Sequence, residues 1–254
     1  MIAGDIEHMP RQLTLRLNLD DEATFDNFYC GPAQSRNSKL LHFLRDTLIP
    51  RAAGAPVSAV GTVLRDFVWL CGAKGAGCSH LLQAVCHGAG QLGLQAFYLD
   101  FSAHRGLSPD VLQGMENVPI LCLDAIDLLA GDQEWELALF SLYNRMAERQ
   151  TPLLVAAHSS PAQQPFQLAD LKSRMQSAAV FELELLSDED KAKALQLRAH
   201  KRGFELSDDV AAYLVSHSER SMSALSEVLQ KLDQHSLETK RRVTVPLLKA
   251  LMGW

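Results

Sequence analysis

The fold is decided by the stretch Phe67-Val68-Trp69-Leu70-Cys71-Gly72-Ala73-Lys74-Gly75-Ala76-Gly77-Cys78-Ser79-His80. Its first part, residues 67–71, is a short apolar run that ends at a glycine, which is typical of a buried strand. Apolar residues then recur with helical spacing at Leu81, Leu82 and Val85. The stretch therefore predicts a strand, a glycine-rich loop and a helix in succession.

The loop has the glycine pattern of a phosphate-binding loop. Residues 72–79 fit G-x-x-x-x-G-K-[S/T] at every position except the lysine, which is replaced by Cys78. Glycines let backbone N–H groups turn toward phosphate oxygens, and the N-terminus of the next helix adds positive potential. The predicted nucleotide contacts in this region are Gly72, Lys74, Gly75, Ala76, Gly77, Cys78, Ser79 and His80.

Each of these assignments has an alternative. The loop could be a plain glycine-rich turn, and for His80 an ordinary position on a helix surface is favoured over a nucleotide contact. The glycine spacing also resembles the dinucleotide pattern G-x-G-x-x-G, but no acidic residue closes a convincing βαβ unit here. The strand before the loop and the helix after it favour phosphate binding.

Loss of the lysine affects chemistry more than binding. In such loops the lysine lies against the terminal phosphates, where negative charge is stabilised during transfer. Backbone amides can still hold a diphosphate, and Ser79 can still offer a hydroxyl to Mg²⁺. The sequence therefore favours a nucleoside diphosphate with Mg²⁺; ADP is the first candidate, and another base stays open. Lys74 is the candidate substitute for the missing charge.

A second element of a phosphate site follows the loop. The apolar run 119–123 ends at Asp124, as in a Walker B strand whose carboxylate orients Mg²⁺ through water. An ordinary buried strand capped by an aspartate is the alternative. Ala125 occupies the position of the water-activating acid, and Asp127 is expected to point elsewhere.

Strands and helices alternate along the first part of the chain. Helical spacing appears over 38–49, a short helix is predicted over 109–115, and longer ones over 135–146 and 168–175. Strands are predicted at 96–101, 120–123, 153–157 and 179–185. This alternation predicts an α/β fold with a parallel sheet covered on both faces.

The pattern becomes all helical after Leu186, where Ser187 and Ser207 are predicted helix N-caps. Further helices are predicted over 221–237 and from Pro246. We therefore expect an N-terminal segment (1–23), a nucleotide-binding α/β domain (24–186) and a small helical domain (187–254).

Composition excludes several classes of protein. A net charge of −6 gives no general attraction to nucleic acid. The five cysteines include no C-x-x-C pair, which argues against a disulfide framework and a zinc site. No apolar run approaches the roughly 20 residues that cross a bilayer, so we expect a cytoplasmic protein without membrane contact. Residues 1–8 resemble an unrelated leader, and Met9 is a candidate first residue.

Several motifs together resemble the AAA+ family of the replication initiator DnaA. Phe25-Asp26-Asn27-Phe28 is similar to the family's nucleotide-base motif, which implies that Phe25 and Phe28 lie beside the base. The phosphate loop, Asp124 and the segment Lys172-Ser173-Arg174 follow in the family's order. The resemblance covers about residues 12–254 and is closest to the short DnaA homologues of the Hda family, through residues 142–145, 186–191, 195–199 and 202–206.

This resemblance implies a five-stranded parallel AAA+ sheet, a helical lid and no DNA-reading helix-turn-helix domain. It implies a regulator of chromosomal replication initiation that binds nucleotide, the DNA sliding clamp (the beta subunit of DNA polymerase III) and ATP-bound DnaA. Such proteins promote ATP hydrolysis by DnaA and so prevent re-initiation. The resemblance also implies that DNA is reached only through the clamp, at the nucleoid. Head-to-tail stacking of AAA+ domains makes a homodimer a further expectation.

The clamp contact is predicted in Gln12-Leu13-Thr14-Leu15-Arg16-Leu17, which resembles the clamp-binding peptide Q-L-[S/D]-L-x-L. In this mode Leu13, Leu15 and Leu17 enter a hydrophobic groove while Gln12 forms hydrogen bonds at its rim. The same alternation would suit a half-buried strand. The terminal position favours the clamp peptide, because chain ends are usually free to bind.

The resemblance also assigns Arg174 as an arginine finger, a residue that reaches the terminal phosphate of a neighbouring AAA+ subunit. An ordinary surface arginine is the alternative. The family's other catalytic positions are altered. His158 stands at sensor 1, and Ser223 at sensor 2 with Arg220 as a stand-in. Together with Cys78, these changes predict a site that binds nucleotide with little turnover.

Two other functions stay open at this point. An autonomous AAA+ ATPase, such as a helicase loader, would need Lys74 to replace the missing lysine. A DNA-binding remnant is the weakest alternative, because the net charge is negative.

Overall fold

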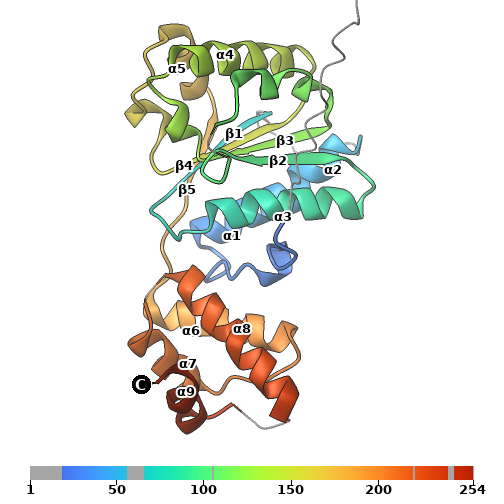
Figure 1. Ribbon diagram of the computed structural model, residues 1–254. Helices are drawn as coiled ribbons and strands as arrows, with labels where there is room; N and C mark the ends of the chain where they lie inside the picture. Colours follow the sequence, from blue (N-terminus) through green and yellow to red (C-terminus); the bar gives the residue numbers. More distant parts are fainter. Residues whose placement is uncertain (1–18, 56–65, 105, 220, 240–242, 254) are drawn as a thin grey trace, which may run out of the picture.

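The computed structural model describes residues 19–55, 66–104, 106–219, 221–239 and 243–253. Figure 1 shows an α/β domain joined to a smaller, all-helical domain. The predicted clamp peptide and Arg220 lie outside the described residues. Among the described helices, none combines the length and the apolar character that a membrane crossing needs.

The α/β domain is built on a five-stranded parallel sheet, as the sequence predicts. Its strands are β1 (Phe67–Cys71), β2 (Ala96–Asp100), β3 (Ile120–Asp124), β4 (Leu153–Ala157) and β5 (Ala179–Glu182). They lie in the order β2-β3-β4-β1-β5, and every neighbouring pair is parallel. The order places the ends of β1, β3 and β4 next to one another at the carboxyl edge, where open α/β sheets bind ligands.

Helices cover both faces of the sheet (Figure 1). One face carries α1 (Arg36–Phe43), α2 (Ile49–Ala52) and α3 (Cys78–Gln91), and the other carries α4 (Gln133–Glu148) and α5 (Ala169–Gln176). Because side chains alternate along a strand, Val68 and Leu70 pack under the first layer while Trp69 and Cys71 pack under the second. Burial on both faces explains the unbroken apolar strands.

Short turns join these elements. They are η1 (Phe25–Asn27), η2 (Leu44–Leu48), η3 (Pro109–Leu112), η4 (Met115–Asn117), η5 (Ile126–Leu129) and η6 (Pro161–Gln163). The predicted helix over 38–49 begins earlier, because the Ser35 hydroxyl accepts the Ser38 N–H, and it passes through the π-helical turn η2. The predicted helix over 109–115 is instead two 3₁₀ turns, separated at Gly114 where φ is +80°.

The helical domain contains α6 (Asp188–Lys201), α7 (Asp208–His217), α8 (Met222–Thr239) and α9 (Val245–Met252) among the described residues. The Ser187 cap is confirmed, since its side chain accepts the Asp190 N–H. Ser207 is confirmed as the N-cap residue of α7, although its hydroxyl donates to the Asp209 carboxylate and accepts no backbone N–H of the helix. Leucines and valines of these helices form a core of their own.

The segment 22–29 lies between the two domains (Figure 1). Arg202, the C-cap of α6, pairs with Glu22, and Lys201 Nζ lies 3.4 Å from an Asp26 carboxylate oxygen. On the same helix, Asp190 accepts a hydrogen bond from the Tyr29 hydroxyl at 3.2 Å. The segment is thus held by polar contacts to the lid.

Candidate nucleotide-binding site

The predicted strand–loop–helix is present at the carboxyl end of β1. Residues 72–77 form the loop, and α3 begins at Cys78 with Gly77 as N-cap at φ +104°. A Cβ on Gly77 would lie 2.7 Å from a Phe28 ring carbon, and one on Gly72 would lie 2.9 Å from the Ala76 Cβ. Both glycines are therefore required by close packing, while Gly75, at φ +89°, faces open space.

Cys78 supplies no charge to this loop. Burial, with the nearby Asp124 carboxylate second, raises the pKa of the Cys78 thiol to about 12. The thiol is therefore neutral near pH 7, so it neither replaces the ammonium of the usual lysine nor acts as a thiolate. Lys74 is exposed in the loop. The part of the site beside α3 thus relies on backbone amides for anion binding.

Asp124 ends β3 as a buried carboxylate inside a polar network. It accepts hydrogen bonds from the Tyr98 hydroxyl, at 2.8 Å, and from the Ala125 N–H, also at 2.8 Å. Burial raises the pKa of Asp124, while the nearby Ser79 and Tyr98 hydroxyls oppose that rise. The loop and the Walker B strand are therefore brought together as predicted.

These residues fit a magnesium ion held mainly by phosphate and water. The Asp124 carboxylate and the nearby Ser79 hydroxyl are oxygen donors of the kind Mg²⁺ prefers, and Mg²⁺ commonly takes only one or two protein ligands. In the described part of the chain, no group of three or more His, Cys, Asp or Glu side chains could hold a metal by itself. Ser79 and Asp124 would therefore hold Mg²⁺ jointly with a bound nucleotide.

Tyr98 and Asp100 are members of this network that sequence reasoning missed. Asp100 ends β2 directly opposite Asp124 in the sheet register, and its charge contributes to the raised pKa of Asp124. Burial also raises the pKa of Tyr98, so its hydroxyl stays a proton donor. A tyrosine within an apolar strand was the available signal, because a buried hydroxyl needs a partner.

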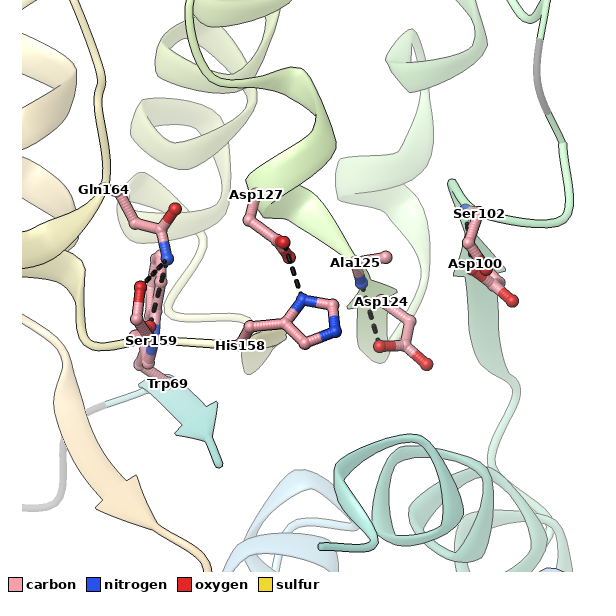
Figure 2. A network of polar contacts seen from close by, with 9 residues as sticks. All are labelled: Trp69, Asp100, Ser102, Asp124, Ala125, Asp127, His158, Ser159 and Gln164. Carbon is pink, nitrogen blue, oxygen red and sulfur yellow. Dashed lines mark hydrogen bonds and ion pairs between the residues drawn. The ribbon is translucent and has the colours of Figure 1, made fainter. Parts of the chain in front are cut away.

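The expectation that Asp127 points elsewhere is wrong. Asp127 Oδ2 lies 2.7 Å from His158 Nδ1, and His158 directly follows β4 (Figure 2). The reason is the backbone of Ala125, which adopts φ +56° in the left-handed region. This turn starts η5 immediately and returns Asp127 to the sheet edge. The sensor 1 position is therefore tied to the Walker B turn.

Phe28 of the segment 22–29 and His80 of α3 pack against each other beside the loop. Their ring centroids are 5.4 Å apart, and the Phe28 ring packs on Gly77. Phe25 is buried beside Gly88, so it anchors the segment against α3. A base-side role for Phe25 and Phe28 stays a prediction, with Phe28 nearer the loop.

His80 is not the helix-surface residue that the sequence favours. Its Nε2 lies 2.8 Å from the Thr24 carbonyl, a bond in which the ring N–H donates. Burial lowers the pKa of His80 from 6.5 to about 4. The imidazole is therefore neutral near pH 7, and its hydrogen bond joins α3 to the backbone of the segment 22–29.

This buried histidine predicts an acid-dependent loss of stability. Between pH 6.5 and about 4 the unfolded chain binds a proton at His80 that the folded chain does not, so folding weakens as pH falls. We expect the free energy of unfolding to be lower at about pH 5 than at about pH 7.5. This decrease should be about 2 kcal/mol larger in the wild type than in His80→Gln. Urea unfolding of both proteins measures this, and equal losses in the two would contradict it.

The lid side of the site contains a residue that sequence reasoning did not single out. The Arg198 guanidinium bonds the Ser226 hydroxyl, and its Nε lies 3.5 Å from the Asn27 carbonyl oxygen. Ser223, at the sensor 2 position, is exposed and bonds Ser221. Arg198 is thus a described lid arginine that reaches the segment 22–29.

Arg174 lies in the last turn of α5 on the far side of the sheet. Its side chain is exposed, and its guanidinium carbon is 5.8 Å from the centre of the Tyr143 ring. No ion pair to Arg174 occurs within the described ranges. The guanidinium is therefore presented to solvent.

Glu136 of α4 positions the Arg174 helix, and it was also missed. Its carboxylate is 1% exposed and accepts the N–H groups of Gly131, Gln167 and Leu168 at 2.7–3.1 Å. Leu168 is the N-cap of α5 and has no cap bond from its own side chain. Glu136 therefore supplies the cap from another helix.

Comparisons with known proteins agree with this architecture. Residues 188–252 match the family model described as the Hda lid domain. The fold is similar to that of DnaA domain III from Thermotoga maritima, with a TM-score of 0.68 and 19% identity over 93% of this chain and 98% of that one. It is also similar to AMPPCP-bound DnaA from Aquifex aeolicus, with a TM-score of 0.64 and 20% identity over 87% of this chain and 69% of that one.

A third similar structure is the RuvB Holliday junction branch migration motor of Thermotoga maritima, with a TM-score of 0.63 and 16% identity over 91% of this chain and 73% of that one. The parallel sheet and the helical domain give the chain the AAA+ fold of these DnaA and RuvB structures. Within that fold, the segment 188–252 is Hda-like, because it matches the Hda lid domain.

Proposed function

We propose that this protein holds a nucleoside diphosphate with Mg²⁺, docks on the sliding clamp and stimulates ATP hydrolysis by DnaA, thereby preventing re-initiation. ADP is the proposed nucleotide. The clamp peptide is the segment of Gln12, Leu13, Leu15 and Leu17, and DNA is reached only through the clamp.

The observation that carries this proposal is the contrast between the chain's own site and its exposed arginine. The site retains the loop, Ser79 and Asp124, but the lysine position holds the neutral thiol of Cys78. Arg174, by comparison, is solvent-exposed on a helix capped from Glu136. Such an arrangement favours stabilising charge in a partner's active site over hydrolysing its own nucleotide.

The resident nucleotide would connect the two domains. The segment 22–29 packs on the loop through Phe28 and on α3 through His80, and it also contacts α6 of the lid. A nucleotide on the loop would therefore lie beside the residues that fix the lid. On this proposal its role is to stabilise the arrangement that presents Arg174, and Mg²⁺ would neutralise phosphate charge there.

The direct test measures ATP hydrolysis by DnaA with this protein, clamp-loaded DNA and each component omitted in turn. We expect stimulation only when this protein and the loaded clamp are both present. Replacing Leu15 and Leu17 by alanine should abolish the clamp-dependent stimulation. Stimulation that is unchanged without the clamp would contradict the docking part, and no stimulation in any combination would contradict the proposed function.

A further inference from the structure

We propose that Asp127 and His158 form a proton-accepting pair with which this chain slowly hydrolyses a nucleoside triphosphate bound at its own site. His158 would take the role of the acid that is missing at Ala125, and Asp127 would position it. This activity lies beyond the proposed stimulation of DnaA and requires only that the chain binds a nucleotide. The diphosphate of the proposed function would then be the product of the chain's own reaction.

The sheet order places His158 at the phosphate side of the site. β4 lies between β3, which ends at Asp124, and β1, which leads into the phosphate loop. The residue after β4 is therefore flanked by both halves of the site, at the edge where such sheets bind ligands. Figure 2 shows the His158 ring between Asp127 and Asp124.

The contact with Asp127 fixes which ring nitrogen is free to react. The carboxylate only accepts hydrogen bonds, so the 2.7 Å contact requires the proton on Nδ1. The neutral ring then carries its lone pair on Nε2. The His158 side chain is 62% exposed, whereas the Asp127 side chain is only 19% exposed. Nε2 is thus open to water while the other nitrogen is held from within.

Asp127 is also suited to stabilise a protonated His158. Its Oδ1 is buried and receives no hydrogen bond from any residue that the structure describes. Its Oδ2 is bonded to His158, and His158 is its ion-pair partner among the described residues. The attraction between this carboxylate and the ring is strongest when the ring is an imidazolium, which is the state that follows proton abstraction.

The backbone on both sides of the pair is firmly held. Ser159, next to His158, has its carbonyl bonded by Trp69 Nε1 at 3.0 Å and by Gln164 Nε2 at 3.1 Å, and Trp69 is fully buried. On the other side, the left-handed Ala125 is bonded to Asp124 (Figure 2). Such support is what a reactive group needs to keep its geometry.

The reaction can be written with all protons assigned. A water molecule transfers a proton to His158 Nε2, and its oxygen forms a bond to the terminal phosphorus. The bond between that phosphorus and the bridging oxygen breaks, and its electron pair stays on the diphosphate. The imidazolium pairs with Asp127 and then releases its proton to solvent. Because Cys78 is neutral, the reaction is slow compared with that of loops that keep a lysine.

A single-turnover assay tests the pair. The full chain, in excess over ATP labelled at the terminal phosphate and with Mg²⁺ present, should release labelled phosphate faster than buffer alone. His158→Ala should slow release by about 100-fold, since a positioned base contributes about 10²–10⁴-fold. Added imidazole should restore part of the rate. Asp127→Asn should slow release by about tenfold, and Asp127→Glu should recover part of it.

His104→Ala is the matched control. His104 follows β2, and its Nδ1 lies 2.9 Å from the backbone carbonyl of Asp100. It is thus a histidine near the same edge for which no carboxylate partner occurs among the described residues. Its replacement should leave the rate unchanged. ADP affinity should also stay within about threefold in His158→Ala, because the base contributes to the reaction and not to binding.

Three results would overturn the inference: no release by the wild type above buffer, an unchanged rate in His158→Ala, or a lost rate that imidazole does not restore. DnaA is absent from this assay. A negative result therefore leaves the proposed stimulation of DnaA standing, and a failure of that stimulation leaves this inference standing.

Discussion

Replacing Arg174 with alanine is expected to reduce the stimulated ATP hydrolysis of DnaA by about 10³-fold, or to its unstimulated level. An arginine supplied to a neighbour's terminal phosphate is worth about 10³–10⁵-fold in such sites. The side chain is exposed and its one described ring contact, to Tyr143, is worth little in stability. The variant should therefore fold normally, and its loss of activity can be assigned to the missing guanidinium.

Two companion variants make this result specific. Lys172→Ala removes a cation from the same helix and should keep most of the stimulation. Arg174→Lys keeps the positive charge but loses the planar fork, so it should recover only a small part. The readout is phosphate release from ATP-bound DnaA with clamp-loaded DNA. Full stimulation by Arg174→Ala would remove Arg174 from the proposed mechanism.

Replacing Glu136 with alanine is expected to lower the free energy of unfolding by about 3–5 kcal/mol, because buried N–H groups lose their acceptor and a cavity remains. The N–H groups of Gly131, Gln167 and Leu168 all depend on this one carboxylate. Glu136→Gln should also destabilise, by about 2 kcal/mol, since its NH₂ group would face an N–H donor. Urea unfolding measures both changes.

Glu134→Ala is the control for this experiment. Glu134 lies two residues before Glu136 in the first turn of α4. Because Glu134 is exposed, its replacement should change the free energy of unfolding by less than about 0.5 kcal/mol. Glu136 caps α5, the helix that contains Arg174. Folded Glu136→Gln protein should therefore also stimulate DnaA less than the wild type does. Wild-type stability in Glu136→Ala would show that the loop before α5 is held by other contacts.

Much of the fold could be predicted because its signals are local. The loop contains glycines because a Cβ would not fit in the tight turn there. The strands are continuous apolar runs because the sheet is buried on both faces. Ser187 marks the start of α6 through its own side chain. Features of this kind depend on neighbours in the sequence, so one sequence is enough to find them.

The polar network at the sheet edge could not be predicted in the same way. The contact between Asp127 and His158 depends on a left-handed turn at Ala125, a conformation that alanine rarely adopts and that no pattern announces. The Tyr98 bond to Asp124 depends on the register of β2 beside β3. Glu136 looks like any acidic residue in the first turn of a helix until the distant loop folds over it.

The segment 22–29 contacts both the phosphate loop and the lid. One side of it is packed on the phosphate loop through Phe28, and the other is joined to the lid through charged pairs at Glu22 and Asp26. The segment therefore links the phosphate loop to the lid directly. Binding of the proposed clamp peptide, which precedes this segment in the chain, would act on both through it. Because the charged pairs are partly exposed, salt should weaken the contacts between the segment and the lid but not the packing of Phe28 on the loop.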